Sequence, residues 1–496
     1  MNLLKTGQTA SAPSILARAM QDTRKDISLM LESLQSRGRF LVAPSGESFY
    51  FDTKTCSVVA IEQGDRDFML LMGGHEFCPD KTFIERAQRH ALSFGTSADV
   101  YRMAHIKTST STVYVHSQDS EVFRITASGI ETVQNGADDV YFICEQGSIP
   151  FSLVDLPAGC GDLLLKHIAK ALPLAKTHID KDQARFLVMS WLCALFLPEL
   201  LPMMPLLVLV GPPSAGKSTF MRLINELLFG RQKTIFRTPV NQKAFDSEVG
   251  RHRMLCMDNV TDWSPWLDGR LENVARRETI QIRKGQNIVD QRLDCAMIMA
   301  ARQFPDAGLQ CINRLLPIVL EKPERPVPER DLIETVRHNR NAIMTQLMLR
   351  LQKLLVDIDS GSPGYTGPYS AADFADVACR LARTIGFEQP MADALDRLAA
   401  LHDASLPGDQ QVFKLLDHWL SNPVNVERQV KATELQREIA VVAKEKGVVF
   451  SMTERSFAQW LKARLNAISQ FFTVVAWEAR SRQFFYRFSR KEVTGG

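Results

Sequence analysis

The stretch LLVLVGPPSAGKSTFMRLINELLFG (residues 206–230) decides the fold of the middle of the chain. Its first five residues are aliphatic and predict a short buried strand. From Lys217 onward, apolar residues return at helical spacing until Gly230, which predicts an amphipathic helix that ends at this glycine. A strand, a glycine-containing loop and a helix in this order are typical of α/β domains with a parallel sheet.

The loop between this strand and helix has the residue types that phosphate binding requires. Glycines at Gly211 and Gly216 let backbone N–H groups face an anion, next to the positive end of a helix dipole. Lys217 is expected to reach the β- and γ-phosphates of ATP, and Ser218 is expected to ligate Mg²⁺. The predicted nucleotide-binding residues are Gly211, Pro212, Pro213, Ser214, Ala215, Gly216, Lys217, Ser218 and Thr219. The loop therefore predicts an ATP hydrolase.

The segment RMLCMDNV (residues 253–260) predicts a second apolar strand, and Asp258 follows its apolar residues. Asp258 is predicted to supply the carboxylate that holds the metal. The alternative is an ordinary strand that ends in a turn aspartate. Asn259 follows, at a position where a glutamate that activates water would be expected, and it is included among the candidate catalytic residues. Asp262, Asp268 and Glu272 could each replace that glutamate, and the spacing does not choose among them.

The length of 496 residues predicts several domains, because single hydrophobic cores stop growing at about 250 to 300 residues. Alternating apolar runs after residue 39 predict a β-rich domain, and a turn-rich segment near residue 360 predicts a hinge. The predicted divisions are an N-terminal helix (1–38), the β-rich domain (39–155), the phosphate-loop domain (156–328), a helical lid or linker (329–405) and a C-terminal domain (406–496).

The C-terminal region has the pattern of a winged helix, with three helical segments followed by two aromatic strands. The pairs Thr433 with Gln436 and Ser451 with Glu454 are spaced as capping boxes that would begin two of the helices. In this fold the last helix enters the major groove and the hairpin tip contacts phosphates. The predicted DNA contacts are Arg455, Gln459, Lys462, Arg480 and Arg482. A winged helix that docks proteins is the alternative.

Composition favours a folded protein of the cytoplasm without a membrane span. The nine cysteines occur singly, which suggests neither a disulfide framework nor a zinc site, and the N-terminus lacks a signal-peptide pattern. Residues 186–210 carry only Glu199 as a charge and are long enough to cross a bilayer. Prolines at 198, 202 and 205 favour a buried helix followed by a buried strand. The net charge is only +3, but the last 66 residues contain twelve basic and six acidic residues.

From about residue 40 to its end, the chain resembles the AAA+ ATPases of phages and bacterial mobile elements. These are relatives of superfamily 3 and poxvirus-type primase-helicases and of the minichromosome-maintenance-like helicases of staphylococcal cassettes. The features that carry the likeness are the β-rich front domain, the pair Trp191 and Leu192 before the phosphate loop, Asp258 and Asn259 leading to Trp266 and Leu267, and the segment ARRETIQIR that ends at Arg283.

This resemblance implies an ATP-dependent helicase or translocase that acts in replication as a homo-oligomeric ring, a hexamer, on single-stranded and duplex DNA. It implies that Arg314, before the apolar run at 315–321, is an arginine finger. The family usually ends its third strand with a sensor asparagine, but this chain has Ala300 and Ala301 there, so Arg302 or Gln303 would substitute. A separate primase is left open as a partner.

Two other functions remain open at this point. One is an ATPase switch that regulates transposition or phage defence without unwinding DNA. The other is a DNA-binding replication initiator that does not hydrolyse ATP.

Overall fold

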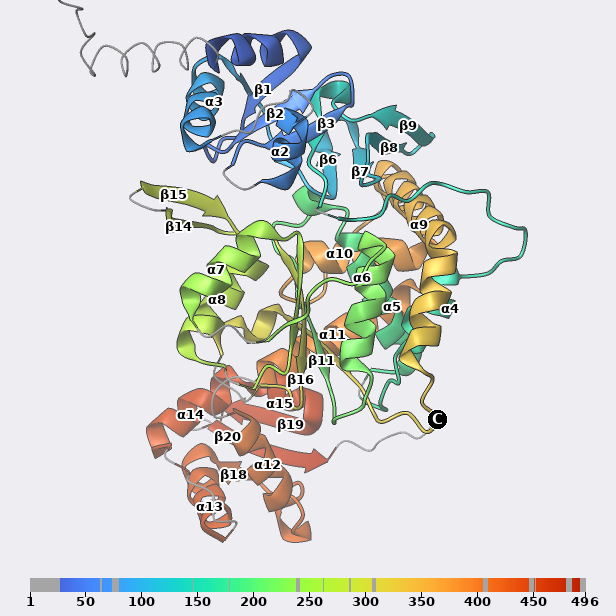
Figure 1. Cartoon of the computed structure of the whole chain (residues 1–496). Helices are drawn as coiled ribbons and strands as arrows, with labels where there is room; N and C mark the ends of the chain where they lie inside the picture. Colours follow the sequence, from blue (N-terminus) through green and yellow to red (C-terminus); the bar gives the residue numbers. More distant parts are fainter. Residues whose placement is uncertain are drawn as a thin grey trace, which may run out of the picture.

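The computed structural model describes most of the chain in a β-rich N-terminal part, a central parallel sheet with helices on both faces, and a small C-terminal unit (Figure 1). The described residues are 27–62, 65–73, 80–145, 147–177, 179–237, 241–261, 263–284, 287–305, 309–404, 409–445, 450, 452–478 and 484–490. Within these ranges no helix is long and apolar enough to cross a membrane. Residues 186–210 instead form helix, a short 3-10 turn and strand, as their prolines favour.

The N-terminal part contains the strands predicted from the alternating apolar runs, together with several short elements that the sequence did not predict. A helix over residues 27–37 leads into it, and the rest of the predicted first helix lies outside the described residues. The strands, grouped by sheet, are β3 (Ser57–Ala60), β2 (Ser48–Asp52), β1 (Gly38–Val42) and β4 (Thr96–Ser97); β6 (Ala104–Lys107), β7 (Thr112–His116), β8 (Glu121–Thr126) and β9 (Gly129–Gln134); and β10 (Tyr141–Phe142) with β5 (Val100–Tyr101). Its helices are α2 (Arg66–Gly73) and α3 (Lys81–Phe94).

The central sheet has five parallel strands whose spatial order differs from their order in the sequence. In spatial order they are β12 (Phe236–Arg237), β13 (Met254–Asp258), β16 (Ala296–Ala301), β11 (Leu206–Val210) and β17 (Leu315–Val319). Because all are parallel, their last residues lie along one edge, here named the carboxyl edge, and their first residues lie along the amino edge. The loop after β11 and the residues after β13 and β16 therefore meet at the carboxyl edge.

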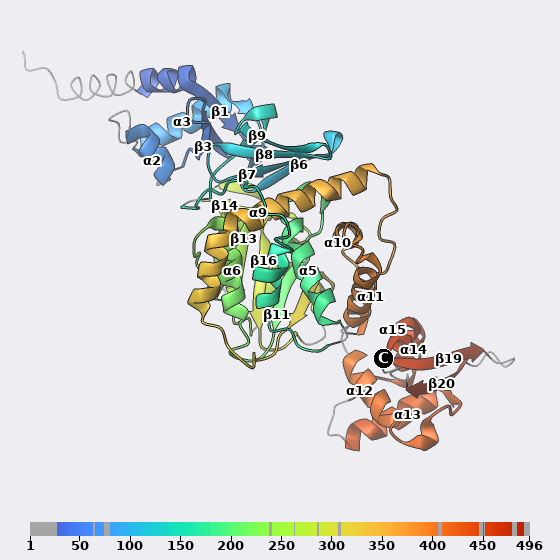
Figure 2. The same ribbon diagram turned by 90° about the vertical axis from the view of Figure 1, so that its right-hand side faces the viewer.

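Alternate residues of the strands pack on two different helical layers, which makes a three-layer core (Figures 1 and 2). Leu207 and Leu209 belong to one buried cluster, whereas Leu206 and Val208 belong to the other. The first layer contains α4 (Leu163–His167), α5 (Lys181–Ala194), α6 (Lys217–Phe229), α9 (Glu329–Asp359), α10 (Ala372–Arg383) and α11 (Glu388–Ala404). The second contains α7 (Gln242–Arg251), α8 (Pro265–Ala275) and the 3-10 turn η5 (Gln310–Arg314). A hairpin of β14 (Thr279–Lys284) and β15 (Asn287–Arg292) extends toward the N-terminal part.

Helix α6 is held against the long helix α9 by buried polar contacts. The carboxylate of Glu226 is fully buried and pairs with Arg337 at 2.7 Å. The buried guanidinium of Arg340 donates to the carbonyls of Leu227 at 2.9 Å and Leu228 at 3.2 Å, two of the last carbonyls of α6. These contacts satisfy backbone groups that the end of a helix leaves without partners.

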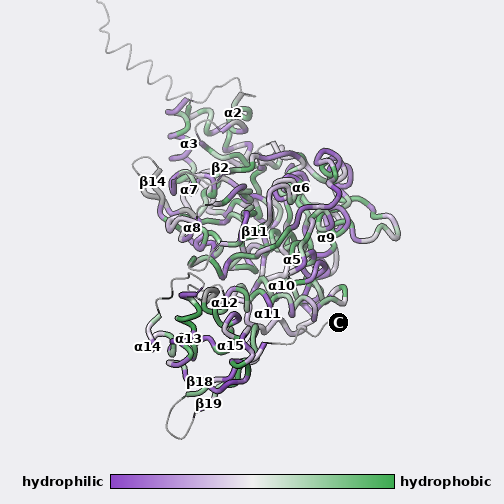
Figure 3. The backbone as a smooth tube through the Cα atoms, turned by 90° about the horizontal axis from the view of Figure 1, so that it is seen from below, coloured by the Kyte–Doolittle hydropathy of each residue, from purple (hydrophilic) through white to green (hydrophobic). Residues whose placement is uncertain are grey.

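The C-terminal unit has a hydrophobic core of its own, and Figure 3 shows hydrophobic segments in this unit as well as around the central sheet. Its helices are α12 (Asp409–Trp419), α13 (Ala432–Glu445), α14 (Glu454–Ala463) and α15 (Leu465–Phe471). Its strands, in the order β18 (Val430–Lys431), β20 (Phe484–Arg490) and β19 (Phe472–Glu478), form the C-terminal sheet. Strand β18 was not predicted, and the single predicted last helix is two helices that meet at Arg464.

The predicted capping boxes are not the caps observed. Helix α14 begins after Thr453, whose hydroxyl accepts a hydrogen bond from the backbone N–H of Ser456 at 3.2 Å. Ser451, the predicted cap, lies outside the described residues. Helix α13 begins before Thr433, and the Gln436 amide donates to the carbonyl of Met452 at 2.7 Å instead of capping its own helix. The hydroxyl nearest the helix start thus takes the cap, and Gln436 joins two segments.

Candidate nucleotide site at the carboxyl edge of the sheet

The loop after β11 has a conformation that its glycines make possible. Gly216 has φ of +78°, which a residue with a side chain rarely adopts, and Ser214 has φ of +64°. A Cβ atom at Gly211 would lie 2.5 Å from the carbonyl oxygen of Leu320, so a side chain does not fit there. The Gly211 N–H donates to the Ala301 carbonyl at 3.2 Å and ties the start of the loop to β16.

Lys217, the first residue of α6, has a half-buried side chain that folds back over this loop. Its Nζ atom donates to the carbonyl oxygens of Gly211 at 2.6 Å and Pro212 at 2.8 Å. Burial lowers the pKa of the ammonium, the Asp258 carboxylate opposes this shift, and the charge of Arg302 adds to it. The ammonium therefore has two carbonyl partners in this structure and does not extend freely into solvent.

Ser218 and Asp258 meet although 40 residues separate them and a strand lies between β11 and β13. The Ser218 hydroxyl donates to Oδ2 of Asp258 at 2.6 Å. A hydroxyl and a carboxylate at this distance supply the oxygen ligands that Mg²⁺ prefers. The structure thus brings the two predicted metal ligands together.

Asn259 lies in the left-handed region, with φ of +57°, and its side chain is exposed. Its backbone N–H donates to Oδ1 of Asp258 at 2.8 Å. The N–H of Val260 donates to the Ala300 carbonyl at 2.8 Å, so the chain turns sharply after β13. Asparagine tolerates this conformation better than most residues. Its observed contact orients Asp258.

A depression of about 290 Å³ opens in front of the loop. Its lining residues are Pro213, Ser214, Ala215, Gly216, Lys217, Ser218, Thr219, Asp258, Asn259, Ala300, Ala301 and Arg302. Arg302 lines this depression, whereas Gln303 does not. Of the two residues proposed in place of the missing sensor asparagine, Arg302 is therefore the one at the site.

The acidic residues considered for water activation are not in the depression. Asp268 is buried in α8, where its carboxylate accepts a hydrogen bond from the Cys311 N–H at 3.0 Å. Glu272 pairs with Arg276 at 2.8 Å, one turn further along the same helix. Asp262 lies outside the described residues. Among the described lining residues, Asp258 is the single carboxylate.

Arg314 lies at the amino edge of the central sheet, whereas the phosphate loop lies at its carboxyl edge. It ends η5 directly before Leu315, which pairs with Leu206, the first residue of β11. Its side chain is half-buried, and burial lowers the pKa of the guanidinium, with the charge of Arg276 acting in the same direction. Arg314 therefore does not reach the loop of its own chain.

One contact of the site was not predicted, because it joins residues 110 positions apart. The Thr219 hydroxyl donates to Oε2 of Glu329, the first residue of α9, at 2.7 Å. Arg222, one turn further along α6, forms an ion pair with the same carboxylate. The start of α9 is thereby attached directly behind the residue that would hold the metal.

The predicted DNA contacts on α14 share one exposed face. Arg455, Gln459 and Lys462 are spaced four and three residues apart and are all exposed. The Lys462 ammonium lies 4.6 Å from the ring centroid of Phe484 in β20. Arg480 and Arg482 lie outside the described residues, so their position at a hairpin tip stays a prediction.

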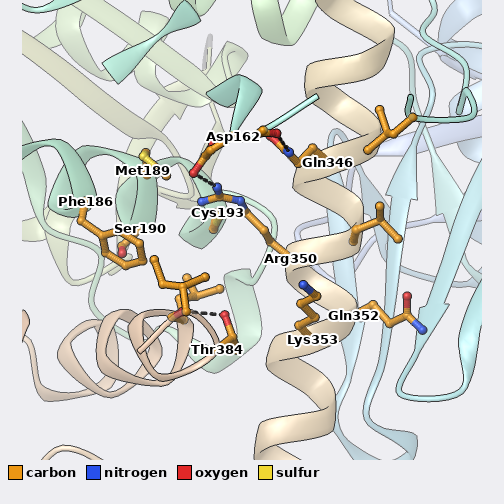
Figure 4. A pocket seen from close by; sticks show the side chains of 15 residues that line it. Asp162, Phe186, Met189, Ser190, Cys193, Gln346, Arg350, Gln352, Lys353 and Thr384 are labelled. Atoms are coloured by element: carbon orange, nitrogen blue, oxygen red, sulfur yellow. Dashed lines mark hydrogen bonds and ion pairs between the residues drawn. The ribbon is translucent and has the colours of Figure 1, made fainter. Parts of the chain in front are cut away.

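A second cavity, of about 320 Å³, lies between α5, α9 and α10, away from the loop (Figure 4). Arg350 of α9 forms an ion pair there with Asp162, and Gln346 accepts a hydrogen bond from the Leu163 N–H at 2.7 Å. These contacts attach the segment before α4 to α9. Within the described residues, no group of three or more His, Cys, Asp or Glu side chains could hold a metal ion.

The parallel sheet and the loop at its carboxyl edge are consistent with a P-loop-like core in a mixed α/β protein of several domains. No family model and no curated protein matches the chain. Among solved structures, the chain is similar to the NrS-1 C-terminal region, with 11% identity, a TM-score of 0.42, and coverage of 92% of this chain and 96% of that chain. It is also similar to the active helicase Cch of SCCmec type IV, with 11% identity, a TM-score of 0.42, and coverage of 91% and 92%. Likenesses this distant assign no role to any residue here.

Proposed function

We propose that this chain is a Mg²⁺-dependent ATP hydrolase of the AAA+ type that drives a DNA helicase or translocase of a phage or mobile element. The observation that carries this proposal is the contact between Ser218 and Asp258, at 2.6 Å, beside the lysine and glycines of the loop. A short hydrogen bond between these two side chains is what a metal bound to both would replace.

The residues present fit ATP and Mg²⁺. The left-handed turn at Ser214 and Gly216 would let phosphate groups come close to the backbone of the loop. The Lys217 ammonium would then bind phosphate oxygens in place of the two loop carbonyls. Ser218 and Asp258 would hold the metal, which supplies positive charge to the phosphates when bound. Asn259 positions Asp258, and Arg302 would stabilise negative charge at the open side of the depression.

The assembly and the DNA contacts are further parts of this proposal. Arg314 would act on the nucleotide of a neighbouring copy in a ring, a hexamer, because it lies at the edge away from its own loop. Residues 406–496 would act as a winged helix, with Arg455, Gln459 and Lys462 of α14 toward duplex DNA and Arg480 and Arg482 at the hairpin tip.

A second candidate is an ATPase switch that regulates transposition or phage defence. It is favoured by the single carboxylate among the described lining residues, since Asn259 occupies the position expected for a water-activating glutamate. Slow hydrolysis suits a switch better than a motor.

The experiment that separates the two functions is ATP turnover by the purified full chain, measured with and without single-stranded DNA. A translocase turns over ATP several-fold faster when DNA is added, because each step on DNA is coupled to hydrolysis. A turnover rate that DNA leaves unchanged favours the switch. The absence of turnover under both conditions, with ATP bound, favours the initiator that does not hydrolyse ATP.

A further inference from the structure

The C-terminal sheet has one face that its own helices do not cover. Along β19 and β20, the residues Phe472, Tyr486 and Phe488 point into the core of the unit. Alternation places the other set on the opposite face, named here the aromatic face. The aromatic face consists of Thr473, Val475 and Trp477 of β19, Phe485, Arg487 and Ser489 of β20, and Lys431 of β18. Val475, in the middle of this face, is 52% exposed.

Two aromatic rings lie side by side on this face. Trp477 and Phe485 are directly opposite each other in the antiparallel register. Their ring centroids are 6.0 Å apart, and the ring planes are inclined by only 21°. Neither residue belongs to the buried core of the unit. Both rings are half-buried, so each keeps part of its surface open to solvent on this face. Large rings are normally buried because their exposure to water is costly, so a pair that stays partly exposed indicates a binding surface.

Two cations lie beside these rings. The guanidinium carbon of Arg487 is 5.2 Å from the Trp477 ring centroid, and the Lys431 ammonium is 5.6 Å from the Phe485 ring centroid. Neither cation forms an ion pair with a described carboxylate. The outward positions of the described strands include no acidic residue, so this face is positively charged.

The aromatic face continues into a shallow groove at its other end. The groove has a volume of about 660 Å³ and is lined by Thr473, Ser489 and Arg490 of the sheet together with residues of the segment that follows α12. The Arg490 guanidinium is paired with Asp417 of α12. Trp477 lies four positions after Thr473, which corresponds to about 13 Å along the strand. The rings and the groove thus form one track across the sheet, with room for a few nucleotides.

We propose that the aromatic face binds single-stranded nucleic acid, with bases stacked on Trp477 and Phe485 and phosphates held by Lys431 and Arg487. Partly exposed rings beside cations that have no described carboxylate partner are what sequence-tolerant single-strand binding requires, because every base has a π face and every nucleotide a phosphate. Duplex DNA offers these rings no free base faces, since its bases already stack on each other. This site is separate from α14, which the proposed function assigns to duplex DNA.

The test is the affinity of the nucleotide-free full chain for a labelled oligothymidylate, measured by fluorescence anisotropy. Trp477→Ala should weaken binding about tenfold, the typical effect of removing one stacking partner. Trp477→Phe keeps a ring and should stay within about threefold of the parent. Phe94→Ala is the matched control, because Phe94 is an aromatic residue that is 70% exposed far from the C-terminal unit, and it should change nothing.

The charge contribution has its own measurement. Arg487→Gln should flatten the log-log salt dependence of single-strand binding by about 0.7, the slope expected for one phosphate contact. An oligonucleotide that carries 5-iododeoxyuridine should cross-link to Trp477 when its complex with the parent chain is irradiated. This measurement does not depend on the folding of a variant.

Unchanged oligothymidylate affinity in a folded Trp477→Ala variant, or cross-linking only to other residues, overturns the proposal. An equal loss of duplex affinity in this variant also overturns it, because the face would then act in general DNA binding. The test does not depend on ATP hydrolysis: Lys217→Ala protein should bind the oligonucleotide as the parent does, so a failure of the proposed ATPase activity is distinguished from a failure here.

Discussion

The two edges of the central sheet both carry charged residues, but in opposite environments. At the carboxyl edge, Lys217, Asp258 and Arg302 line an open depression. At the amino edge, the residues Arg253 and Arg277 are only 5% and 7% exposed, and their guanidinium groups share the carboxylate of Asp294. Burial lowers the pKa of Arg277 to about 10, and the charge of Arg253 contributes to the shift.

The difference between the two edges indicates that a ligand can be bound at the carboxyl edge and not among the paired charges of the amino edge. Arg253 and Arg277 at the amino edge already have a carboxylate partner and stabilise the packing of strands and turns. Charges at the carboxyl edge have partners that a ligand can replace, since these are loop carbonyls and a hydroxyl. Substitutions at the carboxyl edge should therefore change turnover with little effect on stability, and substitutions at the amino edge should do the reverse.

The largest effect is expected at Lys217. Lys217→Ala should lower ATP turnover by more than about 100-fold, because a positioned positive charge contributes about that much to charge stabilisation. The melting temperature should change little, since the side chain contacts only loop carbonyls. Lys243→Ala, at an exposed position of α7, is the matched control. Turnover within about twofold of the parent would remove the loop from the mechanism.

Arg314 breaks the pattern of the amino edge if it acts across a subunit interface. Arg314→Ala should then lower turnover about 100-fold through lost charge stabilisation, although the residue lies far from its own loop. Mixing Arg314→Ala with Lys217→Ala protein should restore part of the activity, because some mixed interfaces combine an intact loop with an intact finger. Activity that stays absent at every ratio, with mixed assemblies confirmed, would contradict this assignment.

Asp294 should affect stability alone. Asp294→Asn leaves Arg253 and Arg277 without their shared carboxylate and should lower the free energy of unfolding by about 2 kcal/mol. The effect is smaller than for a fully buried pair because the Asp294 side chain is 37% exposed. Urea denaturation measures this change, and Asp290→Asn in the exposed hairpin is the control. A loss of turnover per folded molecule would contradict the contrast between the edges.

Arg302 and Gln303 sharpen the comparison at the carboxyl edge, because they are adjacent in sequence and only one lines the depression. Arg302→Ala should lower turnover about tenfold through lost charge stabilisation. Gln303→Ala should leave turnover unchanged. Equal effects of the two substitutions would show that position at the depression does not decide the role.

The smallest effect is expected at His402, which is buried near Arg314. Burial lowers the pKa of His402 to about 4, and the charge of Arg314 acts in the same direction. The unfolded chain therefore takes up a proton that the folded chain excludes, so stability falls as the pH decreases from about 6.5 to 4. His402→Leu should reduce this loss by about 1 kcal/mol at pH 6. His338→Leu, at an exposed position of α9, is the control, and identical pH profiles for parent and His402→Leu would refute the prediction.

The sequence predicted the elements around the phosphate loop because their signals are local. Strand β11 and the end of α6 at Gly230 lie where the aliphatic run and the glycine placed them. Asp258 was found from a strand end, and its contact with Ser218 follows from parallel strands sharing one edge. The choice between Arg302 and Gln303 could not be made, because it depends on how one turn leaves β16.

The other features depend on packing between distant segments. The order of the strands places β16 between β11 and β13, which no local pattern specifies. The contact of Glu329 with Thr219 has no sequence signal, since a charged residue at a helix start is common. Prediction of the aromatic face would have required the register that places Trp477 opposite Phe485. Prediction of the start of α14 would have required knowing which of two nearby hydroxyls caps the helix.

Helix α9 connects the candidate nucleotide site with the N-terminal part of the chain. It has 31 residues and is about 46 Å long at 1.5 Å per residue. Glu329 at its start contacts Thr219, and Gln352 near its other end donates to the Ala127 carbonyl beside β8 in the N-terminal part. These two points are about 35 Å apart, so a tilt of about 5° at the nucleotide end moves the far end by about 3 Å. A tilt of the helix at the candidate nucleotide site would thus be felt where the N-terminal part lies against the helix (Figure 2).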